Sequence, residues 1–177
     1  PSWAFAVVAE NVAGEFCLYA VLGGQVIVDD NSPHYIGADF ASSNSGENSG
    51  AAWALLSCLQ DEIFQKFDKF TLNGDSLYTL GQAAGFHAGK VHSKLCLLVA
   101  ALVQSLQVCG KIVATHVPAH IGAPWNELVD TVCTAISLRT AGHRVDVAKC
   151  LSHVAVPVRF PRDETALHWL FMHFLPK

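Results

Sequence analysis

The order in which two kinds of local pattern occur along the chain constrains the fold most. Residues 2–40 contain short apolar extended runs separated by turn residues, whereas residues 51–138 alternate helical runs with short β-branched runs. Extended runs joined by tight turns form antiparallel hairpins, and helix–strand alternation is typical of parallel strands with crossover helices. Together these patterns predict an α/β layered fold with a mixed sheet, an antiparallel meander plus parallel strands, flanked by helices.

The individual elements follow from periodicity and turn residues. In the first part we expect strands over 2–10, 15–22, 25–28 and 35–40, with turns at 11–14 and 23–24. The small polar segment 42–50 is predicted to be a loop that supplies N-cap residues. Beyond it we expect helices over 51–67, 77–85, 91–107 and 124–138, strands over 69–73 and 111–117, and a loop over 118–123.

The last part of the chain differs in character from the rest. The length suits one domain over 1–139, followed by an extension over 140–177 whose role the sequence does not give. Within the extension, prolines punctuate an extended run over 154–161, and residues 164–174 are predicted to form a short helix.

Composition limits the classes of function. Half of the residues are hydrophobic and only 15% are charged, so a substantial core is expected. The net charge of −4 argues weakly against a nucleic-acid partner, but it does not exclude an enzyme that binds phosphate through metal ions. The six cysteines form no CxxC motif, so we expect buried free thiols rather than a zinc site.

The sequence also suggests a location. No segment resembles a signal peptide, and the longest apolar run, Leu95 to Val103, is too short to span a bilayer. Free thiols suit a reducing compartment, so we expect an intracellular protein, cytoplasmic or nuclear and not secreted. Because the chain starts at Pro1 without an initiator Met, we expect a fragment of a longer protein.

Three carboxylates are expected at one edge of the sheet. Glu47 lies near the start of the first helical run, Asp75 follows a strand, and Asp130 lies about two turns into the last long helix. Strand ends and neighbouring helix starts converge in α/β folds, and gathered carboxylates favour a hard cation such as Mg²⁺. Taken singly, each acid also has a plain structural interpretation: a charge near a helix start, an N-cap, or a solvated helix face.

Three motifs in order carry a resemblance to a known family. The segments YIGADFASSNSGENSGAAWALL, LNGDSLYTL and VPAHIGAPWNELVDTV resemble the ribonuclease H domain, most closely those of non-LTR retrotransposon reverse-transcriptase polyproteins. The resemblance covers roughly Trp3 to Leu138. It implies hydrolysis of the RNA strand of RNA–DNA hybrids with Mg²⁺ or Mn²⁺, beside a reverse-transcriptase domain. It also implies that Glu47, Asp75 and Asp130 are catalytic metal ligands.

The same resemblance implies roles for four further residues. His120, in the loop before the last long helix, matches a histidine that assists product release or proton transfer. Asn44 matches an asparagine that contacts the hydroxyl groups of the RNA strand. Ser76 and Asn126 flank the site and are expected to bind substrate.

The chain departs from the family pattern in two places. The family has a further metal-binding Asp on an opening strand, but no Asp precedes the strand-like run from Ser2. Another segment, from 140–177 or from a neighbouring chain, is then expected to fill that strand's place. The second departure is Asn48, where the family usually has an apolar residue. These departures leave a non-catalytic ribonuclease H-like module open as an alternative function, and an integrase- or resolvase-like nuclease as a weaker one.

Overall fold

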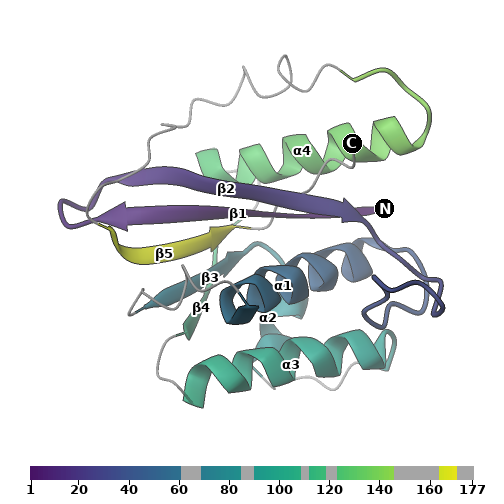
Figure 1. The fold of residues 1–177 in the computed structure, drawn as a ribbon, viewed down its shortest axis with the longest axis horizontal. Helices are drawn as coiled ribbons and strands as arrows, with labels where there is room; N and C mark the ends of the chain where they lie inside the picture. The colour runs from purple at the N-terminus through teal and green to yellow at the C-terminus, as the bar shows by residue number, and fades with distance from the viewer. Residues whose placement is uncertain (61–68, 85–89, 109–111, 119–122, 146–163, 171–177) are drawn as a thin grey trace.

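In the computed structural model, one mixed sheet organises the chain (Figure 1). The structure describes residues 1–60, 69–84, 90–108, 112–118, 123–145 and 164–170. Within them, the strands have the order β2-β1-β5-β3-β4. Their bounds are β1 (Ser2–Asn11), β2 (Phe16–Gln25), β3 (Phe70–Gly74), β4 (Ile112–His116) and β5 (Glu164–Leu170).

The sheet has an antiparallel half and a parallel half. β1 pairs antiparallel with β2 on one side and with β5 on the other, whereas β3 runs parallel to both β5 and β4. The β1–β2 turn is held by Asn11, whose side-chain oxygen accepts hydrogen bonds from the amides of Ala13 and Glu15. The predicted mixed-sheet α/β fold is therefore confirmed.

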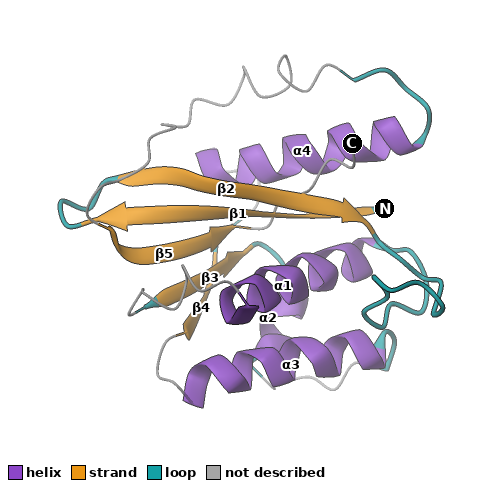
Figure 2. Ribbon diagram, in the orientation of Figure 1, coloured by secondary structure: helices purple, strands orange, loops and turns teal. Residues whose placement is uncertain are grey.

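Helices cover both sides of the sheet (Figure 2). α4 (Pro124–Thr140) packs on β1 from one side, and α1 (Ser43–Gln60) packs on it from the other. α3 (Ser93–Val108) lies against α1, and the short α2 (Leu77–Ala83) follows β3. No helix among the described residues is long and apolar enough to cross a membrane.

The main core fills the space between β1 and the two helices that cover it. Because β1 is buried on both faces, its central residues are apolar without alternation, as expected for an inner strand. Ala6, Val7 and Ala9 have no exposed surface. The small side chains of Ala51 and Ala52 on α1 are equally buried, and they allow the helix to approach the sheet closely.

Several sequence predictions about the first part of the chain are wrong. The expected turn at 23–24 lies inside β2, where Gly24 packs beneath the Trp3 ring: a Cβ there would be 3.3 Å from the ring. The expected strand over 35–40 is a loop. Residues 43–50, predicted as part of a loop, are the start of α1. The predicted C-terminal end of this helix, 61–67, lies outside the described residues. Serine and asparagine disfavour a helix by a fraction of a kcal/mol each and glycine by about 1 kcal/mol, and tertiary packing overrides these preferences.

The final strand is the largest correction. Residues 164–174 were expected to form a helix, but 164–170 form β5, between β1 and β3. We expected a strand from 140–177 or from a neighbouring chain, and β5 belongs to 140–177. An extended conformation there satisfies the backbone groups that β1 and β3 would otherwise leave unpaired, which outweighs local helix propensity. The predicted run over 154–161 lies outside the described residues.

Candidate active site

A pocket of about 400 Å³ opens where β1 begins, β3 ends, and α1 and α4 face each other. β1 contributes its first residues to this pocket, and the chain just beyond the last residue of β3 contributes two more. Among the residues that the structure describes, the lining contains three carboxylates and no lysine or arginine side chain. It consists of Pro1, Ser2, Trp3, Ala4, Ser43, Gly46, Glu47, Asp75, Ser76, Asn126, Val129, Asp130, Cys133 and Ser137.

Glu47 reaches the pocket because α1 approaches β1 very closely. Gly46 makes this possible, since a Cβ at that position would lie 2.6 Å from the backbone oxygen of Ser2. Burial raises the pKa of Glu47, and the charge of Asp75 raises it further, while hydrogen bonds from Ser76 and Thr79 act in the opposite direction. The hydroxyl of Thr79 donates to the Glu47 carboxylate at 3.5 Å. Glu47 is therefore a partly buried acid whose negative charge is poorly compensated.

Asp75 follows β3 directly and is fixed from two sides. The side-chain amide of Asn126, on α4, donates to its carboxylate at 3.4 Å. Nε2 of His116, at the end of β4, lies 3.2 Å from its backbone carbonyl oxygen. The next residue, Ser76, caps α2 by accepting a hydrogen bond from the amide of Thr79 at 3.2 Å. The strand end, the cap and α4 thus hold Asp75 at the pocket.

Asp130 brings the third carboxylate from α4. Asp130 lines the same pocket as the other two acids, and Cys133 lies one helical turn further on. Burial raises the pKa of this thiol to about 12, and the charges of Asp130, Asp75 and Glu47 contribute in the same direction. The three acids therefore act electrostatically on one partly buried thiol, although they belong to three separate elements.

Five of the seven predicted site residues line this one pocket: Glu47, Asp75, Ser76, Asn126 and Asp130. Asn44 is exposed on the first turn of α1 and is not part of the lining, although Ser43 and Gly46 are. His120 lies outside the described residues. Asn48, noted as a departure, is fully buried, and its amide atoms have no hydrogen-bond partner among the described residues.

Sequence reasoning missed four polar residues of the described pocket lining: Ser2, Ser43, Cys133 and Ser137. The hydroxyl of Ser2 donates to the backbone oxygen of Cys133 at 3.0 Å and lies 2.7 Å from the hydroxyl of Ser137. Cys133 and Ser137 follow Asp130 at helical spacings of three and seven, so they share its face of α4. This spacing could have identified both residues from the sequence, whereas Ser2 gave no signal.

The side chains of the pocket are of the chemical type that binds a hard divalent cation. Their spacing fits such an ion less well. Carboxylate oxygens are the ligands that Mg²⁺ prefers, and a cation would offset the repulsion between Glu47 and Asp75. However, the described residues contain no group of three His, Cys, Asp or Glu side chains that could hold one metal ion. The central strand adds no acid at this end, because its one acid, Glu164, pairs with Asn11 at the far end of β1.

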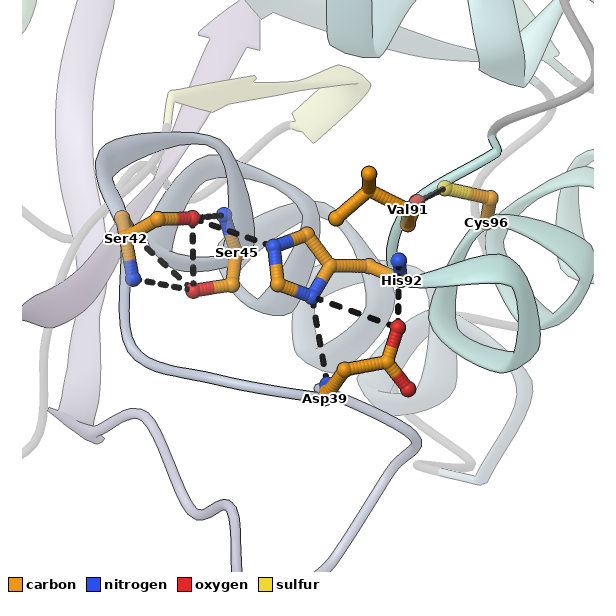
Figure 3. A network of polar contacts seen from close by, with 6 residues as sticks. All are labelled: Asp39, Ser42, Ser45, Val91, His92 and Cys96. Atoms are coloured by element: carbon orange, nitrogen blue, oxygen red, sulfur yellow. Dashed lines mark hydrogen bonds and ion pairs between the residues drawn. The ribbon is translucent and has the colours of Figure 1, made fainter.

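A second polar cluster contains a serine, a histidine and an aspartate (Figure 3). The directions of its hydrogen bonds give it a structural role and not a catalytic one. Nδ1 of the buried His92 accepts the backbone amide of Asp39 at 3.1 Å, so the proton of the neutral ring is on Nε2, which lies 3.1 Å from the Ser42 hydroxyl. The ring therefore donates to the serine instead of activating it. The Asp39 carboxylate accepts the backbone amide of His92 at 2.7 Å.

This cluster fixes the start of α1. Ser42, held by His92, accepts the amide of Ser45 at 3.1 Å, and the Ser45 hydroxyl donates to the Ser42 carbonyl at 2.9 Å. The loop before α1 is thereby tied to the start of α3, and the turn that precedes Glu47 has a defined position.

Comparison with known proteins does not assign the chain to a family. No protein-family model matches the chain, and a search of curated proteins found no match.

Proposed function

We propose that the chain is a ribonuclease H-type endonuclease domain, which hydrolyses the RNA strand of RNA–DNA hybrids with Mg²⁺ or Mn²⁺. One observation carries the proposal: Glu47, Asp75 and Asp130, from α1, the end of β3 and α4, line one pocket. These are the acids that the family resemblance implies, supplied by the kinds of element that it implies. Ser76 and Asn126, the expected flanking residues, contact the same acids.

In this proposal the protein residues bind and orient, while the metal supplies the reactive chemistry. Metal ions of this kind activate a water and stabilise the leaving oxygen in phosphodiester cleavage. Glu47, Asp75 and Asp130 would hold the ions. Asn126 keeps the Asp75 carboxylate oriented, and Thr79 and Ser76 orient Glu47. Because the described part of the pocket lining has no lysine or arginine side chain, we expect substrate phosphate to bind there together with cations.

The proposed setting follows from the same resemblance. The partner would be a reverse-transcriptase domain of the same polyprotein, which produces the hybrid that this domain cleaves. Such a substrate is intracellular, cytoplasmic or nuclear. Among the described cysteines, Cys58, Cys96 and Cys133 are free thiols, which suits a reducing compartment.

A second candidate function is a non-catalytic ribonuclease H-like module that binds nucleic acid or protein. The observation that favours it is the composition of the central strand. After Glu164, the first residue of β5, residues 165–177 contain no acid, so a fourth carboxylate does not come from this segment. With fewer ligands, a two-metal site is weaker.

Cleavage of a labelled RNA–DNA hybrid distinguishes the two candidates. We expect the chain to cut the RNA strand in Mg²⁺ or Mn²⁺, and the Asp75→Asn variant to lose about 100-fold or more of the rate, since it removes a ligand charge at nearly constant shape. Glu127→Gln is the matched control, because Glu127 is on α4 but outside the pocket lining. A folded chain that leaves the hybrid intact in both metals would favour the non-catalytic module.

A further inference from the structure

The continuity of the sheet depends on one strand, β5. In the described sheet β5 is the sole neighbour that β1 and β3 share, so β1–β2 and β3–β4 are joined through it alone (Figure 1). It pairs antiparallel with β1 and parallel with β3, and Leu167 is the partner of Ala9 on one side and of Phe70 on the other. We call the space between β1 and β3, which β5 fills, the channel. It is bordered by two strand edges whose backbone groups form hydrogen bonds with β5.

Leaving this channel empty would be costly. Ala6 and Val8 on β1, and Phe70 and Leu72 on β3, are all 2% exposed or less. Without a strand between them, these residues would lose cover and two rows of backbone groups would be left unpaired. The fold therefore requires an extended segment at this position, whichever polypeptide supplies it.

The strand that fills the channel comes from far along the chain. α4 ends at Thr140 and β5 begins at Glu164. The residues between them, 141–163, span up to roughly 75 Å when extended. In the sequence, β5 lies after all other described elements.

We propose that the channel between β1 and β3 is an exchangeable strand-binding site, and that its second occupant is β5 of another copy of this chain. Each copy carries the segment that fits both edges in register, and its backbone pairings are the same in either molecule. The equilibrium between the chain's own β5 and that of a second copy then depends on the effective concentration of the chain's own strand, which for short flexible connections is about millimolar.

The test uses the full chain and a fluorescently labelled peptide of residues 164–170 as the probe for a second copy's strand. Proline at the centre of β5 cannot donate to either ladder, so Leu167→Pro should release the channel. We expect the peptide to bind this variant about tenfold or more tightly than it binds the unaltered chain, as measured by fluorescence anisotropy. A peptide with proline at position 167 should bind neither protein. Equal, weak binding to both proteins, with near-ultraviolet circular dichroism retained in the variant, would overturn the proposal.

A second measurement applies if Leu167→Pro does not fold. A protease site is inserted within residues 146–163 of the otherwise unaltered chain, and the folded protein is then cleaved there. We expect the cleaved C-terminal piece to stay bound during size-exclusion chromatography and to be displaced by an excess of the labelled peptide. A cleaved protein that keeps its own piece and excludes the peptide after prolonged incubation, or that loses the piece without binding the peptide, would contradict an exchangeable site.

Discussion

At the scale of single residues, Glu47 is the group whose surroundings most clearly separate this pocket from an ordinary polar cleft. It is partly buried, it lies near a second acid, and its hydrogen bonds from Ser76 and Thr79 only partly offset these effects on its pKa. An ionised carboxylate in such a place is destabilised unless a cation accompanies it. Cys133 is affected by the same charges, and its raised pKa keeps the thiol protonated and unreactive near neutral pH.

A stability measurement tests this description of Glu47. Its pKa is higher in the folded chain than the ordinary value of 4.5, so the stability that it contributes is present below that value and is lost as the pH rises through the folded pKa. The glutamine amide in the Glu47→Gln variant carries no charge at any pH. We therefore expect Glu47→Gln to raise the melting temperature, relative to the unaltered chain, by about 1–3 °C more at pH 7 than at pH 4.

The control for this prediction is Glu127→Gln, which changes an acid of α4 outside the pocket lining. Its effect on melting should differ little between the two pH values. Added Mg²⁺ should stabilise the unaltered chain more than Glu47→Gln. If Glu47→Gln lowered the melting temperature equally at both pH values, the carboxylate would be a structural hydrogen-bonding group.

At the scale of elements, the contact between α1 and β1 sets the width of the pocket. Gly46 allows the helix to touch the strand backbone at Ser2, and the His92–Ser42 contact fixes the preceding turn. On the opposite side, α4 carries Asp130 and Asn126 towards the same strand end. The site thus depends on two helices that approach one strand from opposite faces.

A substitution at Gly46 tests this dependence. Gly46→Ala places a Cβ against the Ser2 backbone oxygen, so the helix must move away from the strand. We expect a loss of about 1–3 kcal/mol in the free energy of unfolding, measured by urea denaturation, since backbone atoms cannot yield as a side chain can. Asn44→Ala, at an exposed position of the same helix, should change stability by less than about 0.5 kcal/mol. Equal effects of the two variants would mean that the close approach is not needed.

The elements also show why the sequence predicted some features and not others. The strand before Asp75, the cap at Ser76 and the helix from Pro124 have local signals, so the convergence of Asp75, Asn126 and Asp130 could be predicted. The helical start of α1 could not, because residues 43–50 have weak helix propensity and are held by contacts with β1 and α3. β5 was missed because its extended form depends on two strands that are distant in sequence.

At the scale of the whole molecule, the negative charge of the chain and of its pocket is unfavourable for the substrate that we propose. The chain has a net charge of −4, and its pocket is acidic, yet the proposed substrate is a polyanion. Simple electrostatic attraction would therefore not account for the proposed binding. Cations held between the pocket carboxylates and the phosphates would reconcile the two.

This reasoning predicts a strict metal requirement for hybrid binding. With a labelled, non-hydrolysable hybrid, we expect affinity to fall by about tenfold or more when millimolar Mg²⁺ is replaced by EDTA at constant ionic strength. Fluorescence anisotropy measures this directly. Equal affinity in EDTA would mean that basic side chains outside the pocket bind the hybrid, and that the acids of the pocket have little part in it.

The most direct test of the central claim, that three acids from separate elements form one metal site, is a Mn²⁺ titration followed by electron paramagnetic resonance. The unaltered chain should bind Mn²⁺, and Glu47→Gln, Asp75→Asn and Asp130→Asn should each weaken the same binding by about tenfold or more. Glu127→Gln should bind like the unaltered chain. If the unaltered chain bound no Mn²⁺, or if Asp130→Asn bound it as tightly as the unaltered chain, the three acids would not form a common site.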